Sequence, residues 1–100
     1  MNYHNRFPVK PLFQKLAVEY RPNNDPWGYC MSLFFDIAAE THKRNITPWE
    51  WEYSAGLGLD ESSDIYVRQV LRKLSDKRLL KLGEFCHKLS GFLRLAGRDY

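Results

Sequence analysis

The sequence lacks any long apolar run. A membrane-spanning helix needs about 18 or more consecutive apolar residues, and no stretch of the chain's 100 residues reaches that length. The opening residues, MNYHNRFPVK, also lack the apolar core of a secretory signal. We therefore expect a soluble cytoplasmic protein that has no membrane partner.

Cysteine is scarce, and metal-binding motifs are missing. The two cysteines, Cys30 and Cys86, both fall within apolar helical patterns, which predicts buried, reduced thiols rather than a disulfide. There is no C-x₂-C or H-x₃-H pair, and the adjacent Cys86 and His87 would point in different directions on a helix. We expect neither a metal nor another cofactor.

Catalytic signatures are missing as well. The sequence contains no nucleophile elbow, and the glycines at 56–58 form too short a run to cradle a phosphate. Asp36 and Glu40 could pair as carboxylates, but with Ser32 they form a narrow polar stripe that predicts a solvated helix edge. On that edge Lys43 or Arg44 would neutralise Glu40. We expect no enzymatic activity.

The composition favours a folded helical domain. Hydrophobic residues make up 44% of the chain and aromatic residues 15%, which argues against disorder. The sequence predicts a single small all-α domain of about five helices, with an N-terminal arm at 1–10 and the helical domain at 11–100. We place the helices at about 11–21, 25–44, 48–55, 63–74 and 76–97.

The helix at 25–44 is the predicted centre of that domain. Asp25 can cap it and Pro26 suits its first turn, and we expect it to end near Asn45. Its apolar residues, including Phe34, cover nearly every direction around the axis. Such a helix is one that other elements pack around.

The short helix that follows carries three large aromatic residues. Thr47, Pro48 and Glu50 form a capping-box pattern at its start, and Gly56 is the expected left-handed cap at its end. In barely two turns the aromatic residues cannot all face inward. We therefore predict a protein-binding patch beside two glutamates, and packing against the first helix or the N-terminal arm stays open as the alternative. The patch residues are Trp49, Trp51 and Tyr53.

The last segment, 76–97, allows two folds. Apolar residues alternate steps of three and four from Leu79 to Ala96, which favours a helix. However, Gly83 and Gly91 each disfavour a helix interior, and Ser90-Gly91 could turn a hairpin. The alternative architecture is therefore a winged helix with a C-terminal β-hairpin.

Charge is distributed unevenly along the chain. Residues 1–60 contain six basic and seven acidic residues, whereas residues 61–100 contain nine basic and five acidic residues. Concentrated basic charge of this kind favours an anionic partner. The candidate contact surface for nucleic acid or an acidic protein comprises Arg68, Gln69, Arg72, Lys73, Lys77, Arg78 and Lys81.

Residues 46–80 resemble the helix-turn-helix of DNA-binding domains. A short capped helix, a glycine-containing turn and a helix with a basic face follow one another there. In VRQVLRKLSDKRLL, 67–80, the apolar residues sit where winged-helix regulators place those of their recognition helix. The resemblance implies that 25–44, 48–55 and 63–74 are the three helices of such a domain, and that 63–74 contacts DNA. An amphipathic helix in an ordinary all-α bundle is the alternative.

These observations predict a non-catalytic binding module that engages DNA or a nucleoprotein complex through a basic helical face. The alternative function is that of a protein–protein adaptor or inhibitor, for example an inhibitor of a host defence complex. Compact proteins with few motifs are frequent among the accessory proteins of phages and mobile elements. The sequence leaves the oligomeric state open.

Overall fold

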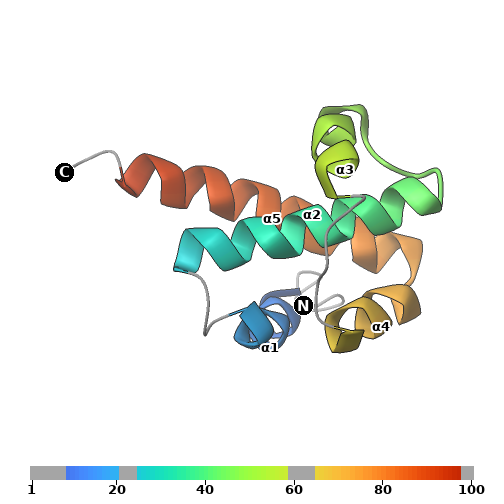
Figure 1. Cartoon of the computed structure of the whole chain (residues 1–100), viewed down its shortest axis with the longest axis horizontal. Coiled ribbons are helices and arrows are strands. Elements are labelled where there is room, and N and C mark those ends of the chain that lie inside the picture. Colours follow the sequence, from blue (N-terminus) through green and yellow to red (C-terminus); the bar gives the residue numbers. More distant parts are fainter. Residues whose placement is uncertain (1–8, 21–24, 59–64, 98–100) are drawn as a thin grey trace, which may run out of the picture.

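The computed structural model describes residues 9–20, 25–58 and 65–97. These ranges form five α-helices and no strand (Figure 1). The helices are α1 (Val9–Ala17), α2 (Pro26–Lys43), α3 (Glu52–Gly58), α4 (Ile65–Lys73) and α5 (Asp76–Gly97), and two 3₁₀ turns occupy Val18–Tyr20 and Trp49–Trp51. The predicted all-α domain is confirmed. No helix in the described ranges is long and apolar enough to cross a bilayer.

The structure also decides two predictions near the ends of the chain, the N-terminal arm at 1–10 and the fold of 76–97. Val9 and Lys10 already belong to α1, so they are not part of an arm, and residues 1–8 lie outside the described residues. At the other end α5 continues through Gly83 and Gly91. The winged-helix alternative with a C-terminal hairpin is therefore not supported.

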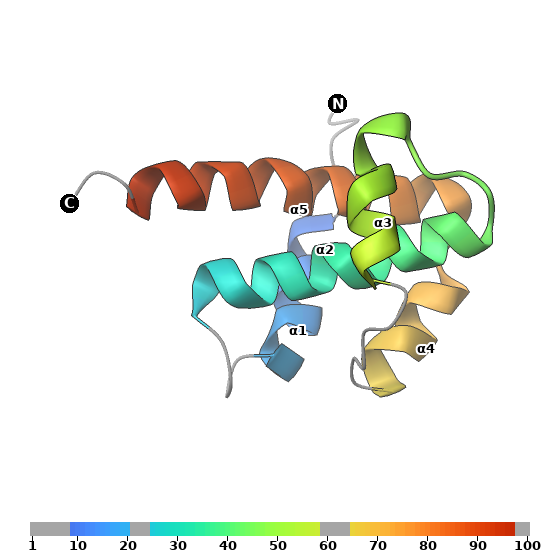
Figure 2. The same ribbon diagram turned by 45° about the horizontal axis from the view of Figure 1, so that its top comes forward.

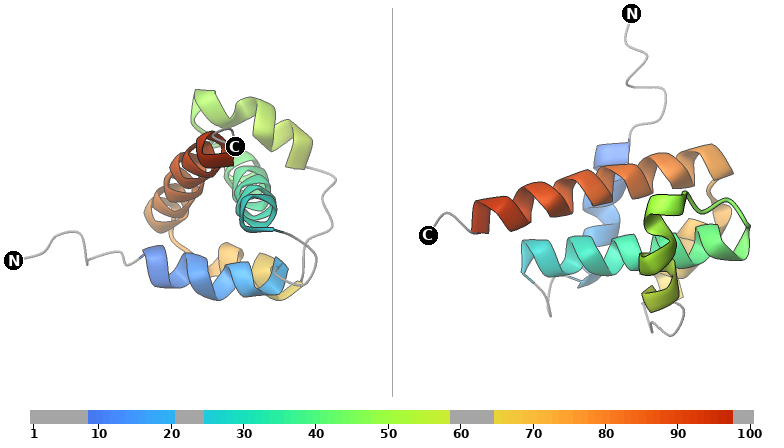
Figure 3. Two further views of the ribbon diagram at one scale, coloured as in Figure 1. Left: turned by 90° about the vertical axis from the view of Figure 1, so that its left-hand side faces the viewer. Right: turned by 90° about the horizontal axis from the view of Figure 1, so that it is seen from above.

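The helices are arranged around the pair formed by α2 and α5. These two run antiparallel and side by side, α1 and α4 cover one face of the pair, and α3 covers the opposite face (Figures 1, 2 and 3). Helix α2 contacts all four other helices. The prediction that 25–44 is the central helix is confirmed.

The predicted boundaries of α2 are also confirmed. The Asp25 carboxylate accepts a hydrogen bond of 2.6 Å from the backbone N–H of Gly28, and Pro26 is the first helical residue. At the other end Asn45 adopts a left-handed conformation with φ of 59°, which asparagine tolerates better than most residues. The chain therefore leaves α2 sharply and turns toward α3.

The hydrophobic core lies along α2. Phe34 is 2% exposed, and its ring meets the indole of Trp51 edge-on with centroids 5.3 Å apart. Asp36 is also buried, at 7% exposure. The predicted solvated stripe is thus wrong, because Asp36 is buried and Ser32 and Glu40 are only partly exposed. The fully or nearly fully buried apolar residues are Phe13, Leu16, Ala17, Cys30, Leu33, Phe34, Ile37, Ala38, Trp51, Ala55, Val67, Leu71, Leu79, Leu82 and Cys86.

The 3₁₀ turn Trp49–Trp51, which precedes α3, packs closely on α5 at a glycine. A Cβ atom built on Gly83 would overlap the six-membered ring of the Trp51 indole and come within 2.9 Å of an Ile37 methyl group. No such contact exists at Gly91, where a Cβ would meet nothing within 4 Å. Gly83 therefore allows the approach of Trp51, which explains a glycine in the interior of a helix.

The predicted caps of the third helix are wrong. The segment begins as a 3₁₀ turn with Pro48 at the capping position and no side-chain cap. The Thr47 hydroxyl lies instead 3.0 Å from the hydroxyl of buried Thr41, so it is engaged at the end of α2. Gly56 lies inside α3, and no described glycine has a positive φ.

Candidate binding surfaces

The first surface is the basic corner, which we define as residues 65–81 where α4 meets α5. Val67 and Leu71 are buried, and so is Leu79 of α5. Burial of these residues turns the polar side chains of both helices outward. Gln69, Arg72, Lys73, Lys77 and Lys81 are exposed, whereas Arg68 and Arg78 are half-buried.

The turn between α4 and α5 has its own cap. The Ser75 hydroxyl accepts a hydrogen bond of 3.2 Å from the backbone N–H of Arg78, as a serine at an N-cap does. Arg78 contributes less to the exposed surface than the sequence suggested, because its Nε is buried without a hydrogen-bond partner. Its stem packs as part of the corner.

Arg44, at the end of α2, binds the end of α4. Its Nη1 donates to the carbonyl oxygen of Leu74 at 2.9 Å, and its Nη2 donates to those of Leu71 at 3.0 Å and Arg72 at 3.2 Å. The last carbonyl groups of a helix have no partner within it and carry partial negative charge. Arg44 therefore satisfies and neutralises the C-terminal end of α4.

Two carboxylates complete this network. Arg44 Nε pairs with Glu40 at 3.0 Å, which makes Arg44 rather than Lys43 the partner among the two that the sequence offered, and Nη1 pairs with Asp76 at 2.9 Å. Partial burial works to lower the pKa of Arg44, but the hydrogen bonds and charges of Asp76 and Glu40 outweigh it and raise that pKa above its usual value. The pairing with Asp76 and the three carbonyl bonds cross about 30 residues of chain, and no local pattern indicates them.

The second surface is the aromatic ridge, which we define as Trp49 and Tyr53 with the flanking Glu50 and Glu52. Trp49 is 82% exposed and Tyr53 is 80% exposed, whereas Trp51 between them is 4% exposed, so both exposed rings project away from the core. Glu50 and Glu52 are exposed as well. Trp51 is only 4% exposed, so it belongs to the core and not to the predicted protein-binding patch.

Open hollows flank this ridge on both sides. One, of about 400 Å³, is lined by His42, Asn45, Thr47, Glu52 and Gly56. The other, of about 390 Å³, is lined by Pro48, Glu50, Trp51, Leu80, Glu84, His87 and Lys88, and in it Lys88 pairs with Glu84 at 3.1 Å. Each hollow thus contains one of the two ridge glutamates.

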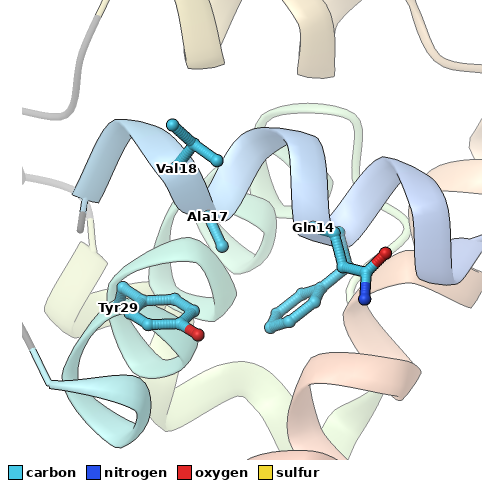
Figure 4. Close-up of a pocket in the computed structure, with 5 residues that line it drawn as sticks. Gln14, Ala17, Val18 and Tyr29 are labelled. Atoms are coloured by element: carbon cyan, nitrogen blue, oxygen red, sulfur yellow. The ribbon is translucent and has the colours of Figure 1, made fainter.

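A third hollow has a different character. It measures about 300 Å³ and lies between Tyr29 of α2 and the segment formed by α1 and the following 3₁₀ turn (Figure 4). The other lining residues are Phe13, Gln14, Ala17 and Val18. None of these lining residues carries a charge, and Val18 is 51% exposed. The hollow offers few polar groups with which to orient a ligand.

The two cysteines form a contact between α2 and α5. Both are buried and unoxidised, as predicted, and the Cys30 thiol donates to the carbonyl oxygen of Cys86 at 3.3 Å. Burial raises the pKa of the Cys86 thiol well above its ordinary value, which disfavours the nucleophilic thiolate. In the described part of the chain no three His, Cys, Asp or Glu side chains are grouped as a metal site would need.

The placement of α3 and α4 bears on the helix-turn-helix resemblance. The two helices pack on opposite sides of α2 (Figures 1 and 3), and the residues that connect them, 59–64, lie outside the described ranges. The basic corner is therefore formed by α4 and the start of α5, and the aromatic ridge is formed by the 3₁₀ turn Trp49–Trp51 and the start of α3. No family model, curated protein or solved structure matches this chain.

Proposed function

We propose that this chain is a non-catalytic module that binds DNA, free or within a nucleoprotein complex, through the phosphate contacts of its basic corner. One observation carries the proposal. Residues 65–81 contain six basic residues and a single acidic residue, Asp76, and the carboxylate of Asp76 is paired with Arg44. This segment therefore carries a clear excess of positive over negative charge.

The corner also has the right electrostatic background for an anion. The carbonyl groups at the C-terminal end of α4 carry partial negative charge and would repel phosphates. The Arg44 guanidinium donates hydrogen bonds to these groups and offsets that negative charge. Arg72 and Lys73 lie in the same last turn and are exposed. Long cationic side chains held on a fixed corner can replace the counterions of several phosphates at once.

Gln69 extends the same surface by one turn of α4 and is exposed. Its amide can hydrogen-bond a phosphate or a base edge. Phosphate contacts fix position and affinity without reading sequence, so the proposal predicts binding to random duplex DNA that weakens steeply with salt.

The test is a salt titration of binding to a random 20-base-pair duplex. Replacing Arg72 and Lys73 together by alanine should weaken binding near 0.1 M salt by roughly one to two orders of magnitude. It should also reduce the log-affinity against log-salt slope by roughly 2, about one unit for each lost contact.

A matched control removes the same charge elsewhere. Lys10 and Lys15 are exposed on α1, and replacing both by alanine changes the net charge by the same amount. This control should retain most of the binding. An unchanged slope in the folded Arg72/Lys73 variant, or an equal loss in the control, would overturn the proposal.

A further inference from the structure

The 49–56 segment has a buried side and an exposed side. Trp51 and Ala55 are buried at 4% and 0% exposure, and they attach this segment to α2 and α5. Trp49 and Tyr53 remain among the most exposed large side chains in the described ranges. Exposed tryptophan and tyrosine are typical of binding hot spots, where they supply large contact area with few rotatable bonds.

We propose that the aromatic ridge binds an arginine-rich peptide segment of a partner protein. The first argument is the chemistry of the rings. A guanidinium group stacks on the face of tryptophan or tyrosine through cation–π attraction. Trp49 and Tyr53 offer two such rings, and both are exposed.

The second argument is charge. From Asn45 to Gly58 the chain contains Glu50 and Glu52 and no lysine, arginine or histidine. Glu50 lines the hollow on one side of the ridge and Glu52 lines the hollow on the other. Carboxylates accept two parallel hydrogen bonds from a guanidinium, so cations along one peptide find both a ring and a carboxylate.

The ridge is also distinct from the basic corner. Helices α3 and α4 lie on opposite sides of α2 (Figure 3), and the two surfaces attract ligands of opposite charge. DNA is repelled by Glu50 and Glu52, and an arginine-rich peptide is repelled by Arg72 and Lys73. The proposal therefore goes beyond DNA binding, and each one can fail alone.

The test is a ¹H–¹⁵N NMR titration of the full chain with four 12-residue peptides. They alternate glycine with arginine, lysine, glutamate or serine. The arginine peptide should shift the indole N–H of Trp49 and the amides of Glu50–Tyr53, and the indole N–H of Trp27 should not move. The lysine peptide should bind more weakly, and the glutamate and serine peptides should cause no shift at α3.

Variants then separate the two arguments. Replacing Trp49 by alanine should weaken the arginine peptide by about three- to tenfold, the range expected for an exposed cation–π contact together with its contact area. Replacing Glu52 by glutamine should weaken it by about two- to fivefold and reduce its salt dependence. Neither change should alter the melting temperature, since both side chains are exposed.

The matched controls are Phe92→Ala and Glu19→Gln. Phe92 is another exposed aromatic residue, at 69% exposure, and Glu19 is an exposed glutamate away from the ridge. Equal losses in these controls, shifts confined to other helices, or no shift at millimolar arginine peptide would overturn the proposal.

A second copy of this chain is the competing occupant, because its basic corner could meet the ridge of a neighbour. Sedimentation velocity of the wild-type chain distinguishes the two. A monomer across the concentrations used for NMR supports the peptide proposal. Self-association that both Trp49→Ala and the Arg72/Lys73 double alanine variant abolish would assign the ridge to a second copy and overturn the peptide proposal.

Discussion

The two sides of α2 are held in place by different means. On the α4 side the guanidinium of Arg44 binds three backbone carbonyl groups and the carboxylates of Glu40 and Asp76. On the α3 side the indole of Trp51 lies against Gly83 and Phe34. One attachment is polar and directional, and the other is apolar and depends on shape.

The exposed surfaces on the two sides of α2 also differ in chemistry. The side with the polar attachment presents a basic corner, and the side with the apolar attachment presents aromatic rings between glutamates. On each side of α2, the contacts that hold the helix in place are therefore made by different residues from those that form the exposed surface. A change at an attachment residue should disturb one surface and leave the other intact, whereas a change in α2 itself should disturb both.

The largest expected effect comes from a substitution in α2 itself, which should destabilise the packing on both of its sides. Phe34→Ala removes a buried ring that contacts Trp51 and lies in the centre of α2, and it should lower the free energy of unfolding by about 3–5 kcal/mol. Urea denaturation measures this loss. The matched aromatic control is Trp49→Ala, which should cost less than about 0.5 kcal/mol because Trp49 is exposed. A loss below about 1 kcal/mol for Phe34→Ala would contradict the central role of α2.

The next effect is confined to the basic corner. Arg44→Ala removes the guanidinium that binds the carbonyl groups of Leu71, Arg72 and Leu74, and we expect it to lower stability by about 2 kcal/mol, as for a lost set of charge-assisted hydrogen bonds that are partly open to water. It should also weaken DNA binding, since the corner loses its support.

Two measurements sharpen the Arg44 prediction. Lys43→Ala removes the same charge from the neighbouring exposed position and should affect stability by at most about 0.5 kcal/mol. Binding of the arginine peptide to Arg44→Ala should stay within twofold of wild type. If Lys43→Ala and Arg44→Ala weaken DNA equally, the contribution of Arg44 is its charge and not the positioning of α4.

Local sequence patterns predicted the helices and the exposed cations well. The cap at Asp25, the end at Asn45 and the outward placement of Arg72 and Lys73 follow from helical periodicity and from residue preferences that act over one or two turns. They required no knowledge of other elements. The same is true of the pair between Glu40 and Arg44, which are four residues apart.

Features set by distant contacts escaped prediction. Thr47 resembles a cap, but its hydroxyl reaches Thr41, and Asp36 resembles a solvated residue but is buried. Nothing local says that Trp51 rather than Trp49 faces inward, because that choice depends on the approach of α5. Gly83 marks the close approach of Trp51, but the sequence does not distinguish it from Gly91 of the same helix, where a Cβ would meet nothing within 4 Å.

The smallest expected effect tests the α3 side through a pair of glycines in α5. Alanine is favoured over glycine within a helix by about 1 kcal/mol, so Gly91→Ala, which meets nothing within 4 Å, should raise stability by about 0.5–1 kcal/mol. Gly83→Ala gains the same helical preference but forces Trp51 to move, and overpacking costs about 1–3 kcal/mol.

The net result for Gly83→Ala should be a loss of roughly 1 kcal/mol, measured by urea denaturation beside Gly91→Ala. Because the displaced ring is that of Trp51, the arginine peptide should bind the Gly83 variant more weakly while DNA binding stays unchanged. This is the reverse of the result expected for Arg44→Ala. Replacing Trp51 by the smaller phenylalanine in the Gly83→Ala background should reduce the overlap and recover part of the peptide binding. If both glycine variants are equally stabilised, the 3₁₀ turn before α3 does not pack on α5 through Trp51, and the apolar attachment proposed for the α3 side is wrong.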